Sequence, residues 1–470
     1  MPHSRTRRSH VLVVLALAAA VASCRSAAIE TSGATRAIVA APAVAVAPVS
    51  ADAETPSVAE IAARRARVAE KLSPDGLLVL RAGEESESSV SGFRPDPDFY
   101  YLTGLVEPGA VLVIDPGRGV DGSAELLFLE PKNSRRETWD GPRLAPGPEA
   151  TRLTGIDKTL PVGDLDGLWD ELVRDKKSAY VNAHTPRGEP ATGDLRRIAE
   201  ASATAPTAAK GPAGENPESS PVSIRRPSAV TGASRQVKSP AEIACLRRAI
   251  DATCEAIRAA AATARPGLPE YRLQALIEFT FRDRGCERPA FASIVGSGPN
   301  SCVLHYRDNR RTMQDGDLVV MDVGGEYRGY AADVTRTIPV SGRFTPEQRA
   351  IYEIVLRAQA AGLAKVAPGS SMRDVHQAAS AVIRDAGYAN AFFHGTSHWV
   401  GLDVHDVGSD PVLRPGMVLT VEPGIYLAEK NLGVRIEDTV LVTETGCEIL
   451  SAAAPKDPDE IEALVLSRAR

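Results

Sequence analysis

The C-terminal half of the chain contains an internal repeat, which limits the possible folds more than any other feature. Gly316 and Gly416 lie 100 residues apart, and each stands six residues before an acidic residue in an apolar run. Upstream, Pro266-Gly267 and Pro368-Gly369 lie 102 residues apart, and each precedes a predicted helix. Repetition at a constant spacing is typical of a duplicated structural unit. We therefore expect residues 239–470 to form one α+β domain whose halves are related by a pseudo-two-fold axis.

Each half of this repeat carries two acidic residues in strand-like surroundings. Asp322 is followed by Asp333 after 11 residues, and Glu422 is followed by Glu437 after 15 residues. A pseudo-two-fold axis would bring the two acidic pairs face to face. Buried carboxylates without compensation destabilise a fold, whereas a pair of divalent cations neutralises them. The alternative, exposed strand and turn residues, explains neither the duplicated spacing nor the histidines nearby.

Histidines cluster between the two acidic pairs. The stretch from His394 to Gly408, HGTSHWVGLDVHDVG, contains His394, His398 and His405, which are three of the eight histidines in the chain. Histidine is a common metal ligand and general acid or base. Alone, the cluster could equally be a surface loop. Together with four carboxylates it predicts a site for two divalent metal ions, and an oxygen-rich set with imidazole suits Mn²⁺, Co²⁺ or Zn²⁺.

Helix signals support the same repeat. Ser239-Pro240-Ala241-Glu242 is a capping box with proline at the first helical position. Apolar residues then recur at spacings of three and four, which predicts an amphipathic helix. A second helix is predicted from about Pro269 to Arg284, a third after Thr345 and a fourth after Ser371. The order of two helices followed by strands therefore occurs twice.

Residues 56–200 are predicted to form a separate α/β domain. A helical pattern begins at Ser57, and short apolar runs indicate buried strands at residues 77–80, 111–114 and 126–129. Residues 201–234 are rich in alanine, proline, serine and glycine and show no apolar period. We therefore interpret residues 201–238 as a linker or insertion.

The chain begins with the features of an export signal. Three arginines in the first eight residues precede an apolar run of 12 residues, 11–22, which is short for a membrane span. The run ends Val21-Ala22-Ser23-Cys24, which resembles the lipobox of bacterial lipoproteins; a plain secretory signal is the alternative. We expect residues 1–24 to be a signal peptide, Cys24 to carry a lipid anchor, and residues 25–55 to be a low-complexity tether. The protein would then be exported and lie at the periplasmic face of a bacterial envelope.

The net charge argues against one function, and the cysteine spacing argues against one kind of site. The net charge of -6 and the pI near 5.9 argue against nucleic-acid binding, which normally requires a basic surface. The five cysteines after Cys24 show no CxxC spacing. We expect them to be buried free thiols.

The motifs around the acids and histidines are long enough to compare with known families. They begin at Asp322 (DVGGEYRGYAADVTRT), His394 (quoted above), Val418 (VLTVEPGIY) and Gly433 (GVRIEDT). Together with residues 239–248 and 294–306, and with FRPDPDFYYLTGLVEPGAVLVI from Phe93, they resemble aminopeptidase P, a family of pita-bread-fold metallopeptidases. The resemblance covers almost the whole chain after the tether and is weak only between about residues 140 and 238.

The resemblance implies a role for each site residue. The five implied metal ligands are Asp322, Asp333, His398, Glu422 and Glu437, with Asp333 and Glu437 bridging the two ions. The implied catalytic residues are His305, His405 and Glu422. The implied substrate-side residues are His394, Arg435 and Tyr426.

The implied reaction is hydrolysis of the N-terminal Xaa-Pro peptide bond. Two metal ions, most often Mn²⁺, with Co²⁺ or Zn²⁺ as alternatives, would hold a hydroxide between them, because bound metal lowers the pKa of water. The implied partners are peptides with proline at the second position. A dipeptide-specific prolidase and a non-catalytic peptide-binding homologue are the alternatives, and full retention of five ligands weighs against the second.

The family often assembles, so a homo-oligomer is a further implication. The Phe99-Tyr100-Tyr101 cluster could lie at such an interface, but a core strand would explain it equally well.

Overall fold

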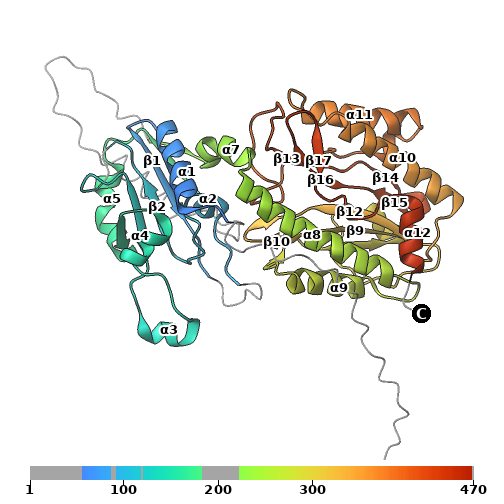
Figure 1. The fold of residues 1–470 in the computed structure, drawn as a ribbon, viewed down its shortest axis with the longest axis horizontal. Helices are drawn as coiled ribbons and strands as arrows, with labels where there is room; N and C mark the ends of the chain where they lie inside the picture. Colours follow the sequence, from blue (N-terminus) through green and yellow to red (C-terminus); the bar gives the residue numbers. More distant parts are fainter. Residues whose placement is uncertain (1–54, 86–91, 118–119, 183–221, 468–470) are drawn as a thin grey trace, which may run out of the picture. The chain divides into compact units, whose positions relative to one another are not determined.

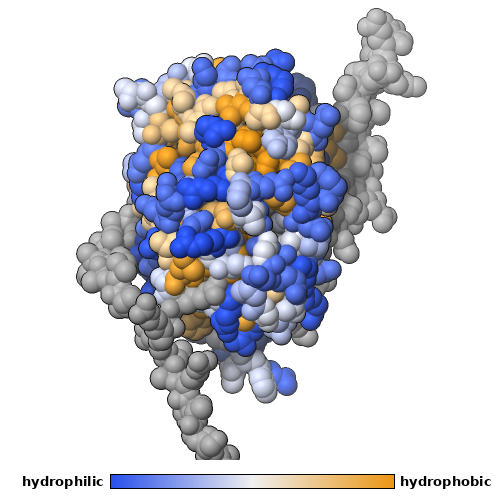
Figure 2. Space-filling model, turned by 90° about the vertical axis from the view of Figure 1, so that its right-hand side faces the viewer, coloured by the Kyte–Doolittle hydropathy of each residue, from blue (hydrophilic) through white to orange (hydrophobic). Residues whose placement is uncertain are grey.

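The structure is a computed structural model that describes residues 55–85, 92–117, 120–182 and 222–467. The predicted signal peptide, Cys24 and the predicted tether up to residue 54 therefore lie outside the described residues. Within the described part, no helix is both long and apolar enough to span a bilayer. Figure 2 shows the side on which α10 (Pro346–Leu363), α11 (Met372–Asp385) and α12 (Pro458–Leu466) lie, with apolar residues gathered in its upper half among hydrophilic ones.

The N-terminal domain is built on a six-stranded mixed sheet (Figure 1). Its elements are α1 (Val58–Lys71), β1 (Gly76–Arg81), α2 (Pro97–Thr103), β2 (Val111–Ile114), β3 (Glu125–Leu129), α3 (Ser134–Asp140), α4 (Pro148–Thr154), β4 (Lys158–Pro161), α5 (Leu165–Val173), β5 (Ser178–Val181) and β6 (Ser223–Arg225). The strand order is β4-β3-β2-β1-β5-β6. The three predicted strands are confirmed as β1, β2 and β3, and Ser57 caps α1 as expected.

The predicted linker is partly wrong. Residues 201–221 lie outside the described residues, but residues 223–236 form β6 and α7 (Ser228–Gln236). All three residues of β6 are exposed, so this edge strand has no apolar alternation that could have revealed it. Helix α7 buries small and polar side chains, including Thr231, Arg235 and Gln236, instead of an apolar stripe. Ion pairs hold this helix in place, and a hydrophobic period in the sequence does not predict such contacts.

The Phe99-Tyr100-Tyr101 cluster lies in helix α2, so of the two alternatives the core strand is wrong, and the interface stays a prediction. The helix begins after Asp96, whose carboxylate accepts hydrogen bonds from the backbone N–H groups of Asp98 and Phe99. Phe99 and Tyr101 are buried in the core. Three of the seven residues of this segment are aromatic, and aromatic residues favour strands. The segment nevertheless forms a helix, because burial of one helix face decides the conformation.

The first half of the C-terminal domain contains two helices and two hairpins. Its elements are α8 (Pro240–Thr263), α9 (Glu270–Asp283), β7 (Arg288–Pro289), β8 (Ile294–Ser297), β9 (Leu318–Val323), β10 (Gly325–Tyr327), β11 (Tyr330–Ala331) and β12 (Val334–Pro339). Ser239 and Glu242 form the predicted capping box at the start of α8. Strand β9 pairs antiparallel with both β8 and β12.

The second half repeats this plan. It contains α10 and α11, then β13 (Val418–Val421), β14 (Gly424–Leu427), β15 (Leu432–Arg435), β16 (Asp438–Val442) and β17 (Cys447–Ile449), and it ends with α12. Strand β13 pairs antiparallel with β16, as β9 does with β12. Helix α8 packs against β10, β11 and β12, and α10 packs against β13, β14 and β15 (Figure 1).

Local details confirm the duplication. Gly316 and Gly416 have φ values of 82° and 88°, a left-handed conformation that glycine adopts without steric cost. The same is true of Gly267 and Gly369, at 82° and 88°. Isolated bridges join Pro269 to Thr312 in one half and Ser371 to Val412 in the other. The spacing in the sequence therefore reports two copies of one turn-and-hairpin unit.

The five cysteines among the described residues are free, as predicted, but the expected burial holds for only three of them. Cys245, Cys254 and Cys286 are buried, and Cys302 and Cys447 are half-buried. Burial raises the pKa of Cys254 and of Cys286 to about 12, so these thiols are inert at neutral pH.

The cap of α2 predicts a pH dependence of folding. Burial, together with the nearby Asp98, raises the pKa of Asp96 from 3.8 to about 6. The folded state then binds a proton more tightly than the unfolded state, so stability should fall as the pH rises from about 4 to about 6. Asp96→Asn keeps the cap and removes the charge. We expect urea unfolding to show a gain of about 1–2 kcal/mol at pH 7 and a flatter profile between pH 4 and 6.

The matched control is Asp457→Asn, which changes the exposed N-cap of α12. This variant should reproduce the pH profile of the parent. A profile unchanged by Asp96→Asn would show that Asp96 is ionised without cost in the fold.

Candidate metal centre and active site

The two hairpins place their acids at equivalent positions. Asp322 lies in β9, opposite Thr335 of β12, and Asp333 immediately precedes β12. Glu422 immediately follows β13, and Glu437 immediately precedes β16. Antiparallel pairing thus brings each return-strand acid back beside the first acid of its hairpin. The duplication puts both pairs at one site.

His398 reaches this site from a segment that pairs with β13. Its backbone N–H donates to Thr420 Oγ1 at 3.1 Å, and its carbonyl accepts from the N–H of Thr420 at 3.0 Å. Its Nε2 then lies 3.4 Å from Asp333 Oδ2 and 3.7 Å from Glu422 Oε1. One ligand atom from each of Asp333, His398 and Glu437 lies within 4.8 Å of the others. These distances are short enough for a shared cation.

The electrostatics of the site fit a divalent cation. Burial and the neighbouring Glu437 and Asp322 raise the pKa of Asp333 well above its usual value. Burial and Asp322 raise the pKa of Glu437 to about 7. Burial and Glu437 also raise the pKa of Glu422. Asp322 Oδ1 and Asp333 Oδ1 are buried without a hydrogen-bond partner among the described residues. Oxygen atoms of this kind are the usual ligands of hard or borderline divalent ions.

Arg435 and Thr335 fix two of the acids. The fully buried guanidinium of Arg435 donates to Asp322 Oδ2 at 2.6 Å. The hydroxyl of Thr335 donates to Glu437 Oε2 at 2.6 Å. Arg435 lines the cavity as a substrate-side residue would, but its ion pair with Asp322 was not foreseen. Thr335 was missed, although a threonine follows the second acid of each hairpin by two residues, at 335 and 439, so the repeat contains the signal.

A short hydrogen-bond chain sets the state of His394. Arg435 Nη1 donates to the hydroxyl of Tyr426 at 3.0 Å, and that hydroxyl lies 2.9 Å from His394 Nε2. His394 Nδ1 lies 2.7 Å from the carbonyl of Gly395, which can only accept. The imidazole therefore carries its proton on Nδ1 and accepts from Tyr426. Burial lowers the pKa of His394 to about 4, so His394 is neutral at pH 7.

The prediction that Tyr426 is a substrate-side residue stays a prediction. Tyr426 is buried and is absent from the wall of the cavity that holds the acids, whereas His394 and Arg435 are part of it. Its hydroxyl supports both of them from behind. The sequence motif identified Tyr426, but only the packing shows that it lies behind His394 and Arg435 and not in the cavity wall.

His405 and His305 complete the wall of the site. The rings of His398 and His405 lie 4.2 Å apart, edge to face. Burial lowers the pKa of His405, and the nearby His398 and His305 lower it further. Both histidines are exposed enough to meet a peptide in the cavity. An imidazole at either position can accept or donate a proton.

A buried ion cluster holds the loop that carries His405. The carboxylate of Asp406 bonds to Arg235 at 2.5 Å and to Lys238 at 3.1 Å. Arg235 also pairs with Asp98 of α2 at 2.9 Å and with Asp403 at 2.9 Å. Although burial opposes ionisation of Asp406, the two cations hold its pKa below the usual value. The interpreted linker therefore supplies Arg235 and Lys238 to the active-site loop, which sequence reasoning missed.

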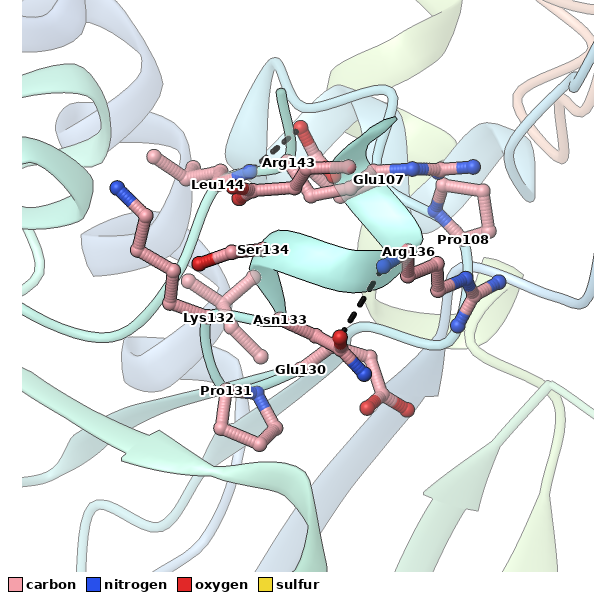
Figure 3. Close-up of a pocket in the computed structure, with 12 residues that line it drawn as sticks. Glu107, Pro108, Glu130, Pro131, Lys132, Asn133, Ser134, Arg136, Arg143 and Leu144 are labelled. Atoms are coloured by element: carbon pink, nitrogen blue, oxygen red, sulfur yellow. Dashed lines mark hydrogen bonds between the residues drawn. The ribbon is translucent and has the colours of Figure 1, made fainter. Parts of the chain in front are cut away.

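These residues surround a cavity of about 520 Å³, large enough for several peptide residues. A second cavity, of about 340 Å³, lies in the N-terminal domain (Figure 3). There the side chains of Asn133 and Glu107 accept hydrogen bonds from the backbone N–H groups of Arg136 and Leu144. Its wall has no histidine, and its mixed charges form no converging acid cluster. Of these two cavities, only the one in the C-terminal domain brings acids and histidines together.

Comparisons with known proteins agree with the geometry. Residues 244–444 match the model of metallopeptidase family M24, and residues 61–181 match that of the aminopeptidase P N-terminal domain. The Xaa-Pro aminopeptidase of Escherichia coli K12 is 36% identical over 451 residues, which cover 87% of this chain and 98% of that protein.

Solved structures of aminopeptidases P also match this chain over most of its length. Zinc-substituted E. coli aminopeptidase P in complex with product matches with a TM-score of 0.78 and 34% identity, over 88% of this chain and all of that chain (100%). Pseudomonas aeruginosa aminopeptidase PepP matches with a TM-score of 0.77 and 35% identity, over 88% and 99%.

The fold and site define a hydrolase of the metallopeptidase class, and the expected pita-bread fold is confirmed. Within that class, the chain belongs to the aminopeptidase P family of M24 metallopeptidases.

The repulsion among the acids predicts opposite effects on stability and activity. In the metal-free protein at pH 8, ionised Glu437 opposes folding, because its folded pKa is raised to about 7. Glu437→Gln removes the charge and retains an acceptor for Thr335. In excess chelator at pH 8, we expect this variant to be more stable than the parent by on the order of 1–3 kcal/mol, measured by urea unfolding, and yet inactive with metal.

Glu448→Gln is the matched control. Glu448 is exposed and pairs with Arg247, so this change should alter neither quantity by much. A lower stability of metal-free Glu437→Gln than of the parent would mean that the acids do not strain the fold.

The ion cluster predicts a second pair of variants. Asp406→Asn leaves Arg235 and Lys238 buried without their shared anion, which typically costs about 3 kcal/mol. Because the change displaces the His405 loop, kcat should fall at unchanged metal content, measured by steady-state kinetics and metal analysis. Asp403→Asn touches the same Arg235, but its side chain is 37% exposed, so the loss should be smaller. Equal effects of the two variants would contradict the view that the buried Asp406 stabilises the His405 loop more than the exposed Asp403 does.

Proposed function

We propose that this protein is an Xaa-Pro aminopeptidase that uses two divalent metal ions. The observation that carries the proposal is the convergence of Asp322, Asp333, His398, Glu422 and Glu437 on one cavity, with three further histidines in its wall. The name of the E. coli relative, Xaa-Pro aminopeptidase, and the near-complete coverage of both chains support the same reaction for this one.

The acids and His398 would hold the ions, with Asp333 and Glu437 as the shared ligands. When bound, the pair supplies an activated water and a Lewis acid for the scissile carbonyl. We propose Mn²⁺ as the native ion because oxygen ligands dominate the set, with Co²⁺ and Zn²⁺ as substitutes. That a zinc-substituted form of the E. coli relative exists supports a site tolerant of several ions.

The chain's own residues then move protons and orient the peptide. Glu422 is half-buried, and its two oxygens lie 3.7 Å from His398 Nε2 and 3.8 Å from His394 Nδ1. A carboxyl with a raised pKa in this place can take a proton from water and pass it to the leaving nitrogen. His405 and His305, on the open side, can donate to the developing oxyanion or to the leaving group.

Selectivity for proline would come from His394 and its surroundings. The nitrogen of a proline in a peptide bond carries no N–H. A pocket for proline therefore needs a matching shape and no acceptor for a backbone N–H. His394 is neutral, is fixed by Tyr426 and packs edge-on against Phe392 at 4.9 Å. A rigid neutral ring next to an aromatic side chain provides such a surface.

Cleavage rates test this function. Metal-free protein should be inactive and should regain activity most strongly with Mn²⁺ or Co²⁺. The reconstituted enzyme should cleave Xaa-Pro-Xaa at least tenfold faster, in kcat/KM, than Xaa-Ala-Xaa, a preference of about 1.4 kcal/mol in the transition state. His394→Ala should reduce this ratio while metal content is retained. Equal rates on the two peptides would leave a metallopeptidase without proline selectivity.

We further propose that the protein is a lipoprotein of the bacterial envelope, anchored through Cys24. The support is the sequence Val21-Ala22-Ser23-Cys24 after a short apolar run. Several acyl chains anchor a protein firmly, whereas one does so weakly.

Fractionation of cells that carry Cys24→Ser tests this location. The parent should sediment with membranes, and the variant should be soluble in the exported fraction. Ser23→Ala, which leaves Cys24 in place, is the control and should behave as the parent does. If the parent is already soluble, the signal is an ordinary secretory one.

A further inference from the structure

His305 reaches the catalytic cavity from a segment that no regular secondary structure holds. The 3-10 turn η3 (Gly298–Cys302) ends just before it, and residues 303–311 form neither helix nor strand. The side chain of His305 is exposed, although it lines the same cavity as the acids. An imidazole that acts on a bound peptide must be held within about 0.5 Å of its productive place. Contacts made by its neighbours in the chain must therefore position it.

The carboxylate of Glu270 is the group around which this segment is organised. Glu270 is the first residue of α9, where a negative charge is favourable, and it is fully buried. Its Oε1 accepts from the N–H and the hydroxyl of Ser297 at 2.7 and 2.6 Å and from the amide of Asn300 at 3.2 Å. Its Oε2 accepts from the hydroxyl of Tyr306 and from the N–H of Arg311, both at 2.9 Å. One buried carboxylate thus binds the start, the middle and the end of the segment.

Tyr306 is the donor that lies next to His305 in the chain. Burial and the hydrogen bond to Glu270 raise the pKa of Tyr306, so its hydroxyl stays protonated and donates at neutral pH. On the other side of His305, the carbonyl of Leu304 accepts from Arg435 Nη2 at 3.4 Å. Both neighbours of the exposed imidazole are therefore anchored to buried charged groups. Tyr306 itself is not part of the cavity wall.

The far end of the segment has an anchor that does not involve Tyr306. Asn309 is buried and has a left-handed φ of 49°. Its Oδ1 accepts from the N–H of Val295 at 3.0 Å, and its Nδ2 donates to the carbonyl of Ser293 at 2.8 Å and to Gln274 Oε1 at 2.9 Å. Loss of the Tyr306 hydroxyl would leave all these bonds in place. Its effect should therefore be confined to the residues beside it.

We propose that Tyr306 is a positioning residue for His305 and that Glu270 holds the Tyr306 hydroxyl in place. Tyr306 acts on the reaction only through the imidazole that precedes it. The inference rests on the proposed Xaa-Pro aminopeptidase activity, in which His305 serves the oxyanion or the leaving group. It adds to that activity a buried carboxylate and a tyrosine hydroxyl that set the place of the imidazole.

Tyr306→Phe removes the hydroxyl and keeps the ring. On metal-loaded enzyme with Ala-Pro-Ala as substrate, kcat should fall by about tenfold or more, because a displaced catalytic group slows the chemical step. KM and metal content should stay within about twofold of the parent, since binding of the peptide and of the ions does not use this hydroxyl. Steady-state kinetics and metal analysis measure these quantities.

Tyr271→Phe is the matched control, because it makes the same chemical change at the next residue of α9, whose side chain is 47% exposed. This variant should keep the kcat of the parent. Glu270→Gln presents an amide to donors that need an acceptor, so it should lower the unfolding temperature together with kcat. Tyr306→Phe, which leaves the other four bonds of Glu270 intact, therefore carries the test.

A double-mutant cycle separates positioning from general structural support. The factor by which Tyr306→Phe lowers kcat should shrink to about one when His305 is already replaced in His305→Ala, because the two residues then act as one unit. The same factor in both backgrounds would overturn the proposal. Cleavage by His305→Ala at the rate of the parent would overturn it as well.

The position of the imidazole can also be observed without activity. In zinc-loaded protein with isotope-labelled histidine, the ring signal that His305→Ala removes from the NMR spectrum belongs to His305. This signal should shift or broaden in Tyr306→Phe and remain unchanged in Tyr271→Phe. An unchanged His305 signal in Tyr306→Phe would overturn the proposal even if His305→Ala is wholly inactive.

The outcomes distinguish this inference from the proposed function. If the parent cleaves no proline peptide, the proposed function fails and the inference fails with it. If the parent cleaves Ala-Pro-Ala and Tyr306→Phe keeps its kcat, only the positioning role is refuted and the aminopeptidase proposal stands.

Discussion

Repulsion among buried carboxylates is the constraint around which the C-terminal domain is organised. Asp333, Glu422 and Glu437 lie close to one another and to Asp322 in mostly buried surroundings, so the ionisation of these three acids opposes folding. The fold overcomes this with two antiparallel hairpins whose backbone pairing is independent of those charges. The stored repulsion is then available as affinity for divalent cations.

A single buried arginine connects the metal centre to the substrate side. Arg435 holds Asp322 with one nitrogen and Tyr426 with another, and Tyr426 in turn fixes the tautomer of His394. The same cation thus offsets an acid and keeps a neighbouring imidazole neutral. Because Tyr426 also packs on Phe393, the chain of contacts continues from the acids to an exposed aromatic side chain.

The sequence predicted the repeat, the helix caps and the convergence of four acids on one site, because each rests on local spacing that survives folding. The set of five ligands was implied by the family resemblance. Ser239, Thr345 and Ser371 cap helices as expected. It failed where the stabilising partner is remote. Helix α7 buries Arg235 against acids more than a hundred residues away on both sides, and no periodic pattern records such a contact.

The ion cluster around Arg235 has a consequence for how such proteins can diversify. Asp98 comes from the N-terminal domain, Arg235 from the segment between the domains, and Asp406 from the active-site loop. A recombination event that exchanged the N-terminal domain alone would bring in a partner not fitted to this arginine. The three residues must therefore be inherited together. A recombination point that keeps them together lies upstream of Asp98 and cannot lie between the two domains.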